Sequence, residues 1–147
     1  MSHYQLAQLN IAKMKFAIDD PGMSGFVARL DDINALADSA PGFVWRLKTE
    51  EGDATGIDYF GTDRLVNMSV WTDLDSLHNY IYRSAHNEVM ALRKQWFDRM
   101  TEAYSVLWWV VENHIPTLEE ASEHLECLRL QGPGPDAFTF KQEFDPQ

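Results

Sequence analysis

The sequence is poor in cysteine, in basic residues and in long apolar runs, and each shortage excludes a class of protein. Cys127 is the only cysteine among 147 residues, so no disulfide can form within the chain. The 12 basic residues are outnumbered by 23 acidic ones, and the formal net charge of −11 repels phosphate backbones and anionic lipids. The longest apolar run, Tyr104 to Val111, is far shorter than the roughly 20 residues that a membrane-spanning helix needs. Because the N-terminus also lacks the pattern of a signal peptide, we expect a cytoplasmic protein that binds neither nucleic acid nor membrane.

Short catalytic fingerprints are missing as well. The chain contains no glycine-rich nucleotide-binding loop, no GxSxG, no HExxH and no CxxC motif. These absences argue against the common nucleotide enzymes, serine hydrolases and zinc proteases. Enzymes that need no cofactor carry no such motif, so these absences do not exclude cofactor-free catalysis.

The length and the periodicity of apolar residues predict one α+β domain. Strands are predicted at 4–11, 43–48, 65–71 and 104–111, and helices at 24–39, 74–82 and 85–99. This β-α-β-β-α-β order, with the second helix broken in two, is the ferredoxin-like plan. The core of the domain is expected at about residues 4–111.

Residues 112–147 form an extension to this core. Thr117 and Glu120 make a capping box that predicts the start of an extra C-terminal helix. After a break at Gln131-Gly-Pro-Gly-Pro, the segment Ala137–Phe140 is predicted as a short strand, added to a sheet edge of another subunit.

Alternation along the strands predicts two sheet faces of different character. One face is wholly apolar and is expected to pack against the helices; it holds Ala7, Leu9, Ile11, Val66, Met68, Val70, Leu107, Trp109 and Val111. The other mixes polar and aromatic groups; it holds Tyr4, Leu6, Gln8, Asn10, Asn67, Ser69, Trp71, Tyr104, Val106 and Trp108. In the second strand, either Trp45 joins the apolar face and Arg46 the mixed face, or the reverse.

Helices on one side of the sheet leave the mixed face open, and an exposed apolar patch is commonly covered by a second copy. We therefore predict a homodimer, a dimeric α/β barrel, with a cavity in each subunit. Such a cavity accepts a small, flat hydrophobic or aromatic molecule and orients it with a few polar groups. The alternative is a purely structural dimer whose polar residues face trapped water.

Three short segments carry a resemblance to a known family. They are Pro41-Gly-Phe before the second strand, Val70-Trp71 at the end of the third, and Ser84-Ala-His86 at the start of a helix. With the order of elements, they resemble the antibiotic-biosynthesis-monooxygenase-like superfamily of dimeric α/β barrels, and most closely an uncharacterised bacterial branch of it. Members of this superfamily include cofactor-free oxygenases acting on polycyclic phenols, haem-degrading oxygenases and proteins without known activity.

The resemblance leaves the cofactor open between none and haem. Haem-degrading members pair an Asn on the first strand with a His on the helix after the third strand, and carry a Trp between them. Asn10 and His86 match the first two positions, whereas Asn79-Tyr80 stands near the place of the Trp. This departure argues against opening of a porphyrin ring but not against haem binding. No metal is expected unless His86 ligates haem iron.

Three residues are predicted to carry the chemistry. His86 would move a proton or ligate haem iron, and its place at a helix N-terminus favours the neutral imidazole that both roles need. Asn10 and Asn67 would donate hydrogen bonds to a substrate oxygen.

Four further residues are predicted to bind substrate. Trp71 and Trp108 would stack on a planar ligand, Tyr104 would donate a proton, and Arg46 would pair with a ligand carboxylate. An ordinary salt bridge is the alternative for Arg46.

Two classes of function follow. The first is a small monooxygenase-like enzyme acting on a flat aromatic or hydrophobic substrate, either cofactor-free or haem-using. The second is a non-catalytic module that binds a hydrophobic metabolite or haem. The sequence does not decide whether the protein is an enzyme.

Overall fold

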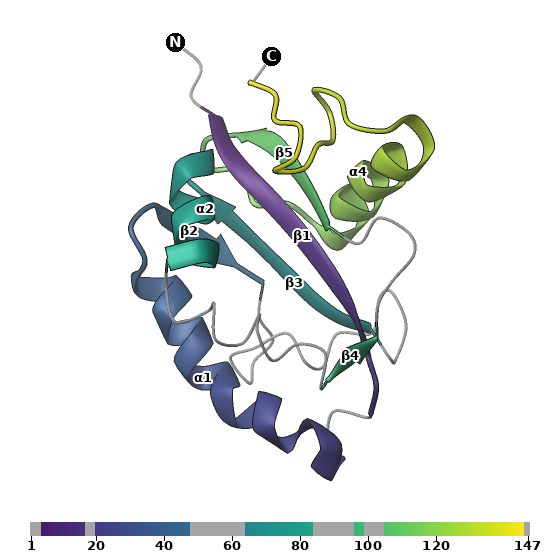
Figure 1. The fold of residues 1–147 in the computed structure, drawn as a ribbon. Coiled ribbons are helices and arrows are strands. Elements are labelled where there is room, and N and C mark those ends of the chain that lie inside the picture. The colour runs from purple at the N-terminus through teal and green to yellow at the C-terminus, as the bar shows by residue number, and fades with distance from the viewer. Residues whose placement is uncertain (1–3, 17–19, 48–63, 84–95, 99–104, 146–147) are drawn as a thin grey trace.

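The computed structural model describes residues 4–16, 20–47, 64–83, 96–98 and 105–145. Five strands form one open antiparallel sheet: β1 (Tyr4–Met14), β2 (Phe43–Arg46), β3 (Arg64–Trp71), β4 (Phe97–Asp98) and β5 (Ser105–Val111). The helices in these ranges are η1 (Pro21–Met23), α1 (Ser24–Ser39), α2 (Leu74–Arg83) and α4 (Leu118–Gln131). Read along the chain, β1, α1, β2, β3, α2 and β5 reproduce the predicted ferredoxin-like order (Figure 1).

Strand β1 is the centre of the sheet. It pairs with β3 on one edge, while β5 and the two-residue β4 pair with it on the other. β2 then pairs with β3. The predicted helix at 85–99 cannot extend to its expected end, because Phe97 and Asp98 lie in β4 opposite Met14 and Lys13. Residues 85–95 and 99 of that predicted helix, and residues 49–63 between β2 and β3, lie outside the described residues.

Sequence features explain where the helices begin and end. Thr117 accepts a hydrogen bond from the Glu120 amide at 3.1 Å, so the predicted capping position starts α4. Asp73 accepts from the Ser76 amide at 2.7 Å and starts α2 in the same way. Gly42, at φ +84°, turns the chain from α1 into β2.

A β-bulge decides which residues of β2 share a face. Phe43 lies opposite Trp71 and Arg46 opposite Ser69, with a register shift between Phe43 and Trp45. One extra residue reverses the alternation, so Phe43 and Arg46 lie on the same face although they are three positions apart. Trp45 packs into the apolar cluster of the other face. The structure thus selects the first of the two predicted arrangements of β2.

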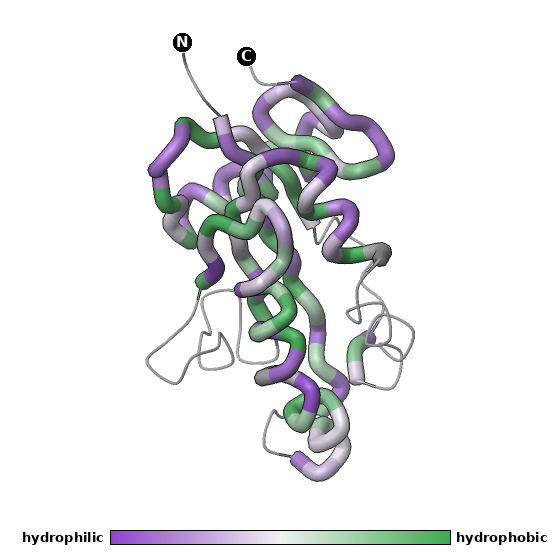
Figure 2. Tube along the Cα trace, turned by 90° about the vertical axis from the view of Figure 1, so that its left-hand side faces the viewer, coloured by the Kyte–Doolittle hydropathy of each residue, from purple (hydrophilic) through white to green (hydrophobic). Residues whose placement is uncertain are grey.

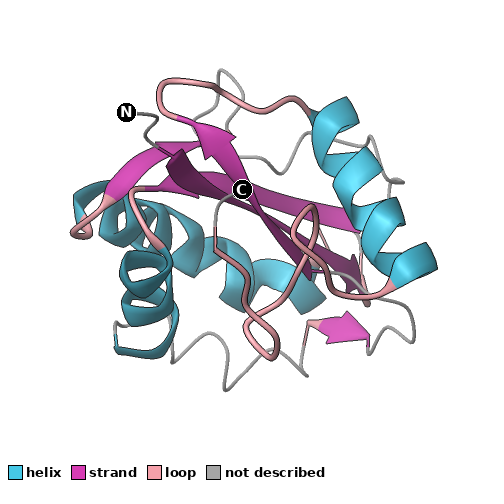
Figure 3. Ribbon diagram, turned by 90° about the horizontal axis from the view of Figure 1, so that it is seen from above, coloured by secondary structure: helices cyan, strands magenta, loops and turns pink. Residues whose placement is uncertain are grey.

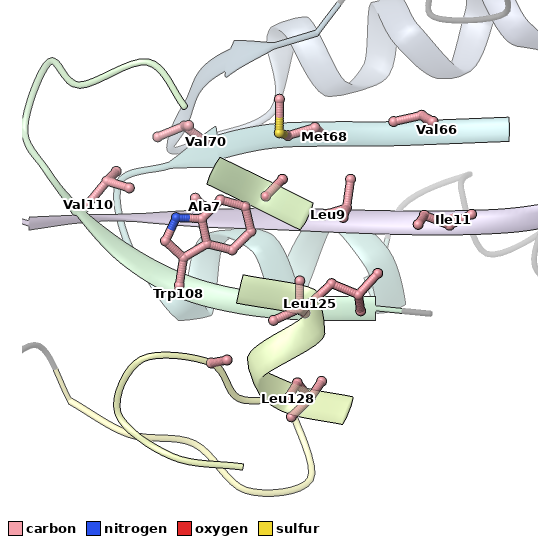
Figure 4. Packing of buried hydrophobic residues seen from close by; sticks show 13 residues of the cluster. Ala7, Leu9, Ile11, Val66, Met68, Val70, Trp108, Val110, Leu125 and Leu128 are labelled. Atoms are coloured by element: carbon pink, nitrogen blue, oxygen red, sulfur yellow. The ribbon is translucent and has the colours of Figure 1, made fainter. Parts of the chain in front are cut away.

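The apolar face of the sheet is covered by α4. Ala7, Leu9 and Ile11 of β1 gather with neighbouring apolar side chains of β3 and β5, and Leu125 and Leu128 of α4 pack onto this cluster (Figure 4). Every buried member of the cluster is at most 6% exposed in a single chain. Apolar stretches accordingly run through the centre of the molecule, as Figure 2 shows.

The mixed face is covered from the other side. Leu77 of α2 packs against Leu6 and Trp71, so α2 and α4 lie on opposite sides of the sheet (Figure 1). The prediction that all helices cover the apolar face and leave the mixed face open is therefore wrong. The apolar clusters described here, one on each face of the sheet, are both buried within one chain. The uncovered mixed face from which the homodimer was predicted is therefore not present, and the homodimer stays a prediction.

The C-terminal segment returns to the sheet of its own chain. Phe138 exchanges two backbone hydrogen bonds with Leu107 of β5, at 2.8 and 2.9 Å. Its side chain is fully buried in the cluster of the mixed face. Figure 3 shows the loop after α4 leading back to the middle of the molecule. The predicted strand at Ala137–Phe140 thus contributes a single bridge to the edge of its own sheet, and not to another subunit.

Candidate functional site

Five polar side chains occupy neighbouring positions on the mixed face, and we call them the polar patch: Gln8, Asn10, Asn67, Ser69 and Ser105. Gln8 lies opposite Ser69, and Asn10 lies between Asn67 and Ser105. Gln8 and Ser69 are 8% and 7% exposed, whereas Asn67 is exposed to solvent. The patch therefore runs from the buried part of the sheet to the surface.

Gln8 joins the two sides of the patch through its amide nitrogen. Nε2 donates to Asn67 Oδ1 at 2.6 Å and to Ser69 Oγ at 2.7 Å. Trp71 Nε1 donates to the same Ser69 oxygen at 2.8 Å. Both lone pairs of the hydroxyl are then used, so its own hydrogen remains for a further acceptor.

An aromatic group closes one end of the patch. The Trp71 and Tyr80 rings are stacked with centroids 5.1 Å apart, and Phe43 meets Trp71 edge-on at 5.5 Å. Trp71 is 1% exposed, and Tyr80 lies against its ring. In this arrangement Trp71 orients Ser69 and supports the patch, and Tyr80 stacks on the ring of Trp71, the residue predicted to stack on a planar ligand.

Tyr80 connects the two helices on this side of the sheet. Its hydroxyl donates to the Ile33 carbonyl of α1 at 3.2 Å. Burial raises the pKa of the Tyr80 phenol to about 12, and Asp38 adds to this while Arg46 opposes it. The phenol is therefore neutral at physiological pH and serves as a hydrogen-bond donor, not as a base.

The raised pKa of Tyr80 predicts a loss of stability in alkali. Below pH 10 the phenol is neutral in both the folded and the unfolded chain, and its contribution does not change with pH. Between its ordinary pKa of 10.0 and the folded pKa of about 12, the unfolded chain ionises first, so the free energy of unfolding falls. Denaturant titrations across this range should show a shallower fall for Tyr80→Phe. Equal slopes for the two proteins would contradict the assignment.

Arg46 lies on the predicted face but is already paired. Its Nε and Nη2 contact the two carboxylate oxygens of Asp38 at 2.7 and 3.3 Å. The Arg46 side chain is 14% exposed and that of Asp38 is 46% exposed, so this ion pair ties β2 to the end of α1 at the protein surface. The geometry supports the alternative of a salt bridge over the predicted pairing with a ligand carboxylate.

Trp108 lies on the opposite face from the polar patch. β5 pairs with β1 so that Trp108 faces the same way as Ala7, while Leu107 lies beside Gln8. Trp108 Nε1 donates to Glu120 of α4 at 3.0 Å, and its ring is stacked on His124 at 4.8 Å. The prediction that Trp108 lies on the mixed face is therefore wrong; this residue anchors α4.

Comparison with known protein families matches residues 5–147 to the family described as Domain of unknown function (DUF3291). The chain belongs to this family. Among curated proteins, no match to the chain is found.

Three solved structures have similar folds. SnoaB, a cofactor-independent oxygenase from Streptomyces nogalater, is 16% identical, with a TM-score of 0.45 over 78% of this chain and 96% of that chain. A candidate antibiotic biosynthesis monooxygenase from Chloroflexus aurantiacus is 14% identical, with a TM-score of 0.48 over 77% and 97%. A protein of unknown function from Nitrosomonas europaea is 13% identical, with a TM-score of 0.48 over 78% and 94%.

The name of the Chloroflexus aurantiacus protein is that of the superfamily which the sequence resembles. At these identities the likeness concerns the fold, and it transfers neither an activity nor site residues to this chain.

The structure brings together some of the predicted site residues and leaves others untested. Asn10 and Asn67 are direct neighbours across β1 and β3, and Trp71 stands one step away through Ser69. His86 and Tyr104 lie outside the described residues. Their predicted roles stay predictions.

Three residues of the site were not among the predicted site residues: Gln8, Ser69 and Ser105. Gln8 and Ser69 stood on the predicted face, and a buried amide opposite a buried hydroxyl could have marked them as a pair. Ser105 was missed because the alternation predicted for β5 placed the wrong set of its residues on the mixed face. Its polarity at the strand start was the one signal that could have shown the phase.

The described part of the polar patch consists of amides and hydroxyls. None of its five side chains is a usual ligand for haem iron, so a haem-using site would depend on His86. Within the described ranges, no three His, Cys, Asp or Glu side chains come close enough to hold a metal ion. In the same ranges, no helix combines the length and apolarity needed to cross a membrane.

Proposed function

We propose that this protein is a small monooxygenase-like enzyme that binds a flat aromatic or hydrophobic compound through an oxygen atom at the polar patch. The observation that carries the proposal is the hydroxyl of Ser69, buried on the sheet and held by two donors so that its hydrogen is left for an acceptor. The adjacent Asn67 amide adds a second donor at the exposed end of the patch. Oxygenation itself is supported by the resemblance of the sequence to the antibiotic-biosynthesis-monooxygenase-like superfamily.

The patch favours the electron-rich form of a phenolic ligand. Donors aimed at an oxygen stabilise the negative charge that develops there on ionisation, and they act most strongly where water is excluded. An ionised phenol can react directly with O2. When a ring CH2 becomes C=O, one oxygen atom enters the product and the other leaves as water, so no external reductant is needed. His86 is the residue proposed to move the proton.

A specific observation favours the alternative of a non-catalytic binding module. The described side chains of the patch are amides and hydroxyls, and these are neither acids nor bases near neutral pH. The buried phenol of Tyr80, whose pKa is about 12, does not supply a base either. Catalysis therefore depends on a proton acceptor such as His86, whereas ligand binding does not.

Oxygen uptake with a polycyclic phenol separates these functions. We expect Asn67→Ala to lower kcat/KM for oxygen uptake by about 100-fold, because a donor to the developing oxyanion is lost. Asn79→Ala, which removes an exposed asparagine of α2, is the matched control and should leave the rate unchanged.

Three outcomes decide between the alternatives. Thermal stabilisation by the phenol without oxygen uptake would favour the binding module over the enzyme. A Soret band in the purified protein that disappears in His86→Ala would support the haem-using version. Equal rates for Asn67→Ala and the unsubstituted protein would refute the proposed role of the patch.

A further inference from the structure

Gln8 is the one member of the polar patch whose side chain is hydrogen-bonded to two others. Its amide nitrogen has two hydrogens, and these are directed at Asn67 Oδ1 and at Ser69 Oγ, at 2.6 and 2.7 Å. Gln8 is 8% exposed and lies in the middle of the central strand, so its surroundings hold it in place. Its orientation therefore acts on both neighbours together.

The contact with Gln8 determines which atoms Asn67 shows to a ligand. Because Oδ1 accepts from Gln8, the NH2 group on the same planar amide must point the other way. No hydrogen bond joins this NH2 group to another of the described residues. Asn67 is exposed, so the group can donate to a ligand.

The same contact determines the role of Ser69. An sp3 hydroxyl oxygen has two lone pairs, and here Gln8 and the Trp71 indole donate to them. The indole N–H is a donor in every state, whereas the Gln8 amide could in principle present its oxygen instead. With its nitrogen toward Ser69, the serine hydroxyl keeps its hydrogen for an outside acceptor.

We propose that Gln8 is a positioning residue that sets the hydrogen-bonding polarity of the patch, so that the site takes flat molecules bearing an accepting oxygen and discriminates against those bearing only a donor. The inference rests on the proposed function in one respect, namely that the patch meets a ligand. It goes further in naming the ligand class, a planar ketone, quinone or phenolate, and the residue that selects it.

Gln8→Glu tests this inference with almost no change in shape. An ionised carboxylate only accepts hydrogen bonds, so the Ser69 hydroxyl and the Asn67 NH2 group would turn inward to it. The atoms facing the ligand would then change from donors to acceptors. Gln8→Met, of similar size, removes the hydrogen bonds without reversing them.

Two rigid tricyclic probes of nearly equal shape measure whether the patch prefers a ligand with a hydrogen-bond acceptor or one with a donor. Fluorenone carries one carbonyl acceptor and no donor, while carbazole carries one N–H donor and no comparable acceptor. Quenching of tryptophan fluorescence gives the Kd for each. The unsubstituted protein should prefer fluorenone by about tenfold, the value of one good hydrogen bond. We expect Gln8→Glu to prefer carbazole and Gln8→Met to bind both about equally. Gln5→Glu on the same strand, facing the other side, should keep the original preference.

Thermal unfolding tests whether each variant is folded. If Gln8→Glu does not fold, the probe preference of Gln8→Met alone tests the inference. An unchanged tenfold preference in the folded variants would overturn the inference, as would failure of fluorenone to bind the unsubstituted protein. Oxygen uptake is a separate measurement. A protein that prefers fluorenone but consumes no oxygen would refute the proposed enzyme and leave the role of Gln8 intact.

Discussion

Replacing Phe138 by alanine is expected to lower the free energy of unfolding by about 3–5 kcal/mol, the usual cost of truncating a fully buried phenylalanine. Phe138 is fully buried and packs with Leu6, Trp71 and Leu107 on the mixed face. Trp109 Nε1 also donates to the Phe144 carbonyl at 2.7 Å, so a second contact holds the same segment. The C-terminal segment should therefore behave as part of the domain core.

Denaturant unfolding measures this loss, and Phe16→Ala is the control. Phe16 is 43% exposed, and its truncation should cost well under half as much. Equal costs for the two variants would show that the segment does not pack against the sheet of its own chain in solution.

Gly42→Ala is expected to be the second large effect, with a cost of about 3 kcal/mol or more. Gly42 has φ +84°, a conformation that L side chains rarely adopt, so any other residue is strained there. An added Cβ would also overlap the Ser76 side chain and lie 2.8 Å from Thr72 Oγ1. Both effects act where the Thr72 amide donates to the Gly42 carbonyl at 2.8 Å, which holds β2 beside the start of α2.

Two other glycines separate strain from steric overlap. Gly132 has φ +77° with nothing within 4 Å of an added Cβ, so Gly132→Ala should show the backbone strain alone, about 1–3 kcal/mol. Gly134 has neither feature, and Gly134→Ala should change stability by no more than about 0.5 kcal/mol. Thermal or denaturant unfolding of the three variants should follow this order. A cost for Gly42→Ala no larger than that for Gly132→Ala would rule out the contact with Ser76.

Local patterns predicted the elements well where the signal lies within one segment. The helix at 24–39 has the expected bounds, and the capping position at Thr117 starts α4. The third strand was expected to begin at Leu65 and begins one residue earlier, at Arg64. Such signals depend on side-chain spacing and on hydrogen bonds between near neighbours, which the sequence displays directly.

The site was predicted in part, for a reason that β5 illustrates. Asn10 and Asn67 share a face, as expected, because in the middle of β1 and of β3 the polar residues stand in one phase and the apolar residues in the other. After Ser105, β5 is apolar in both phases, so its alternation did not show whether Leu107 or Trp108 lies beside Gln8. The hydrogen-bond register with β1 decides this, and a shift by one residue exchanges the two faces.

The sequence by itself determined the order of strands and helices, the starts of α2 and α4, and the two-residue period that gathers Gln8, Asn67 and Ser69 on one side. Only the tertiary structure decided the phase of β5, the coverage of each face, and the contact of Gln8 with both neighbours. Those features arise from pairings between residues far apart in the chain, such as Gln8 with Ser69 and Leu107 with Phe138. No local pattern encodes such pairings, because they depend on how whole elements pack together.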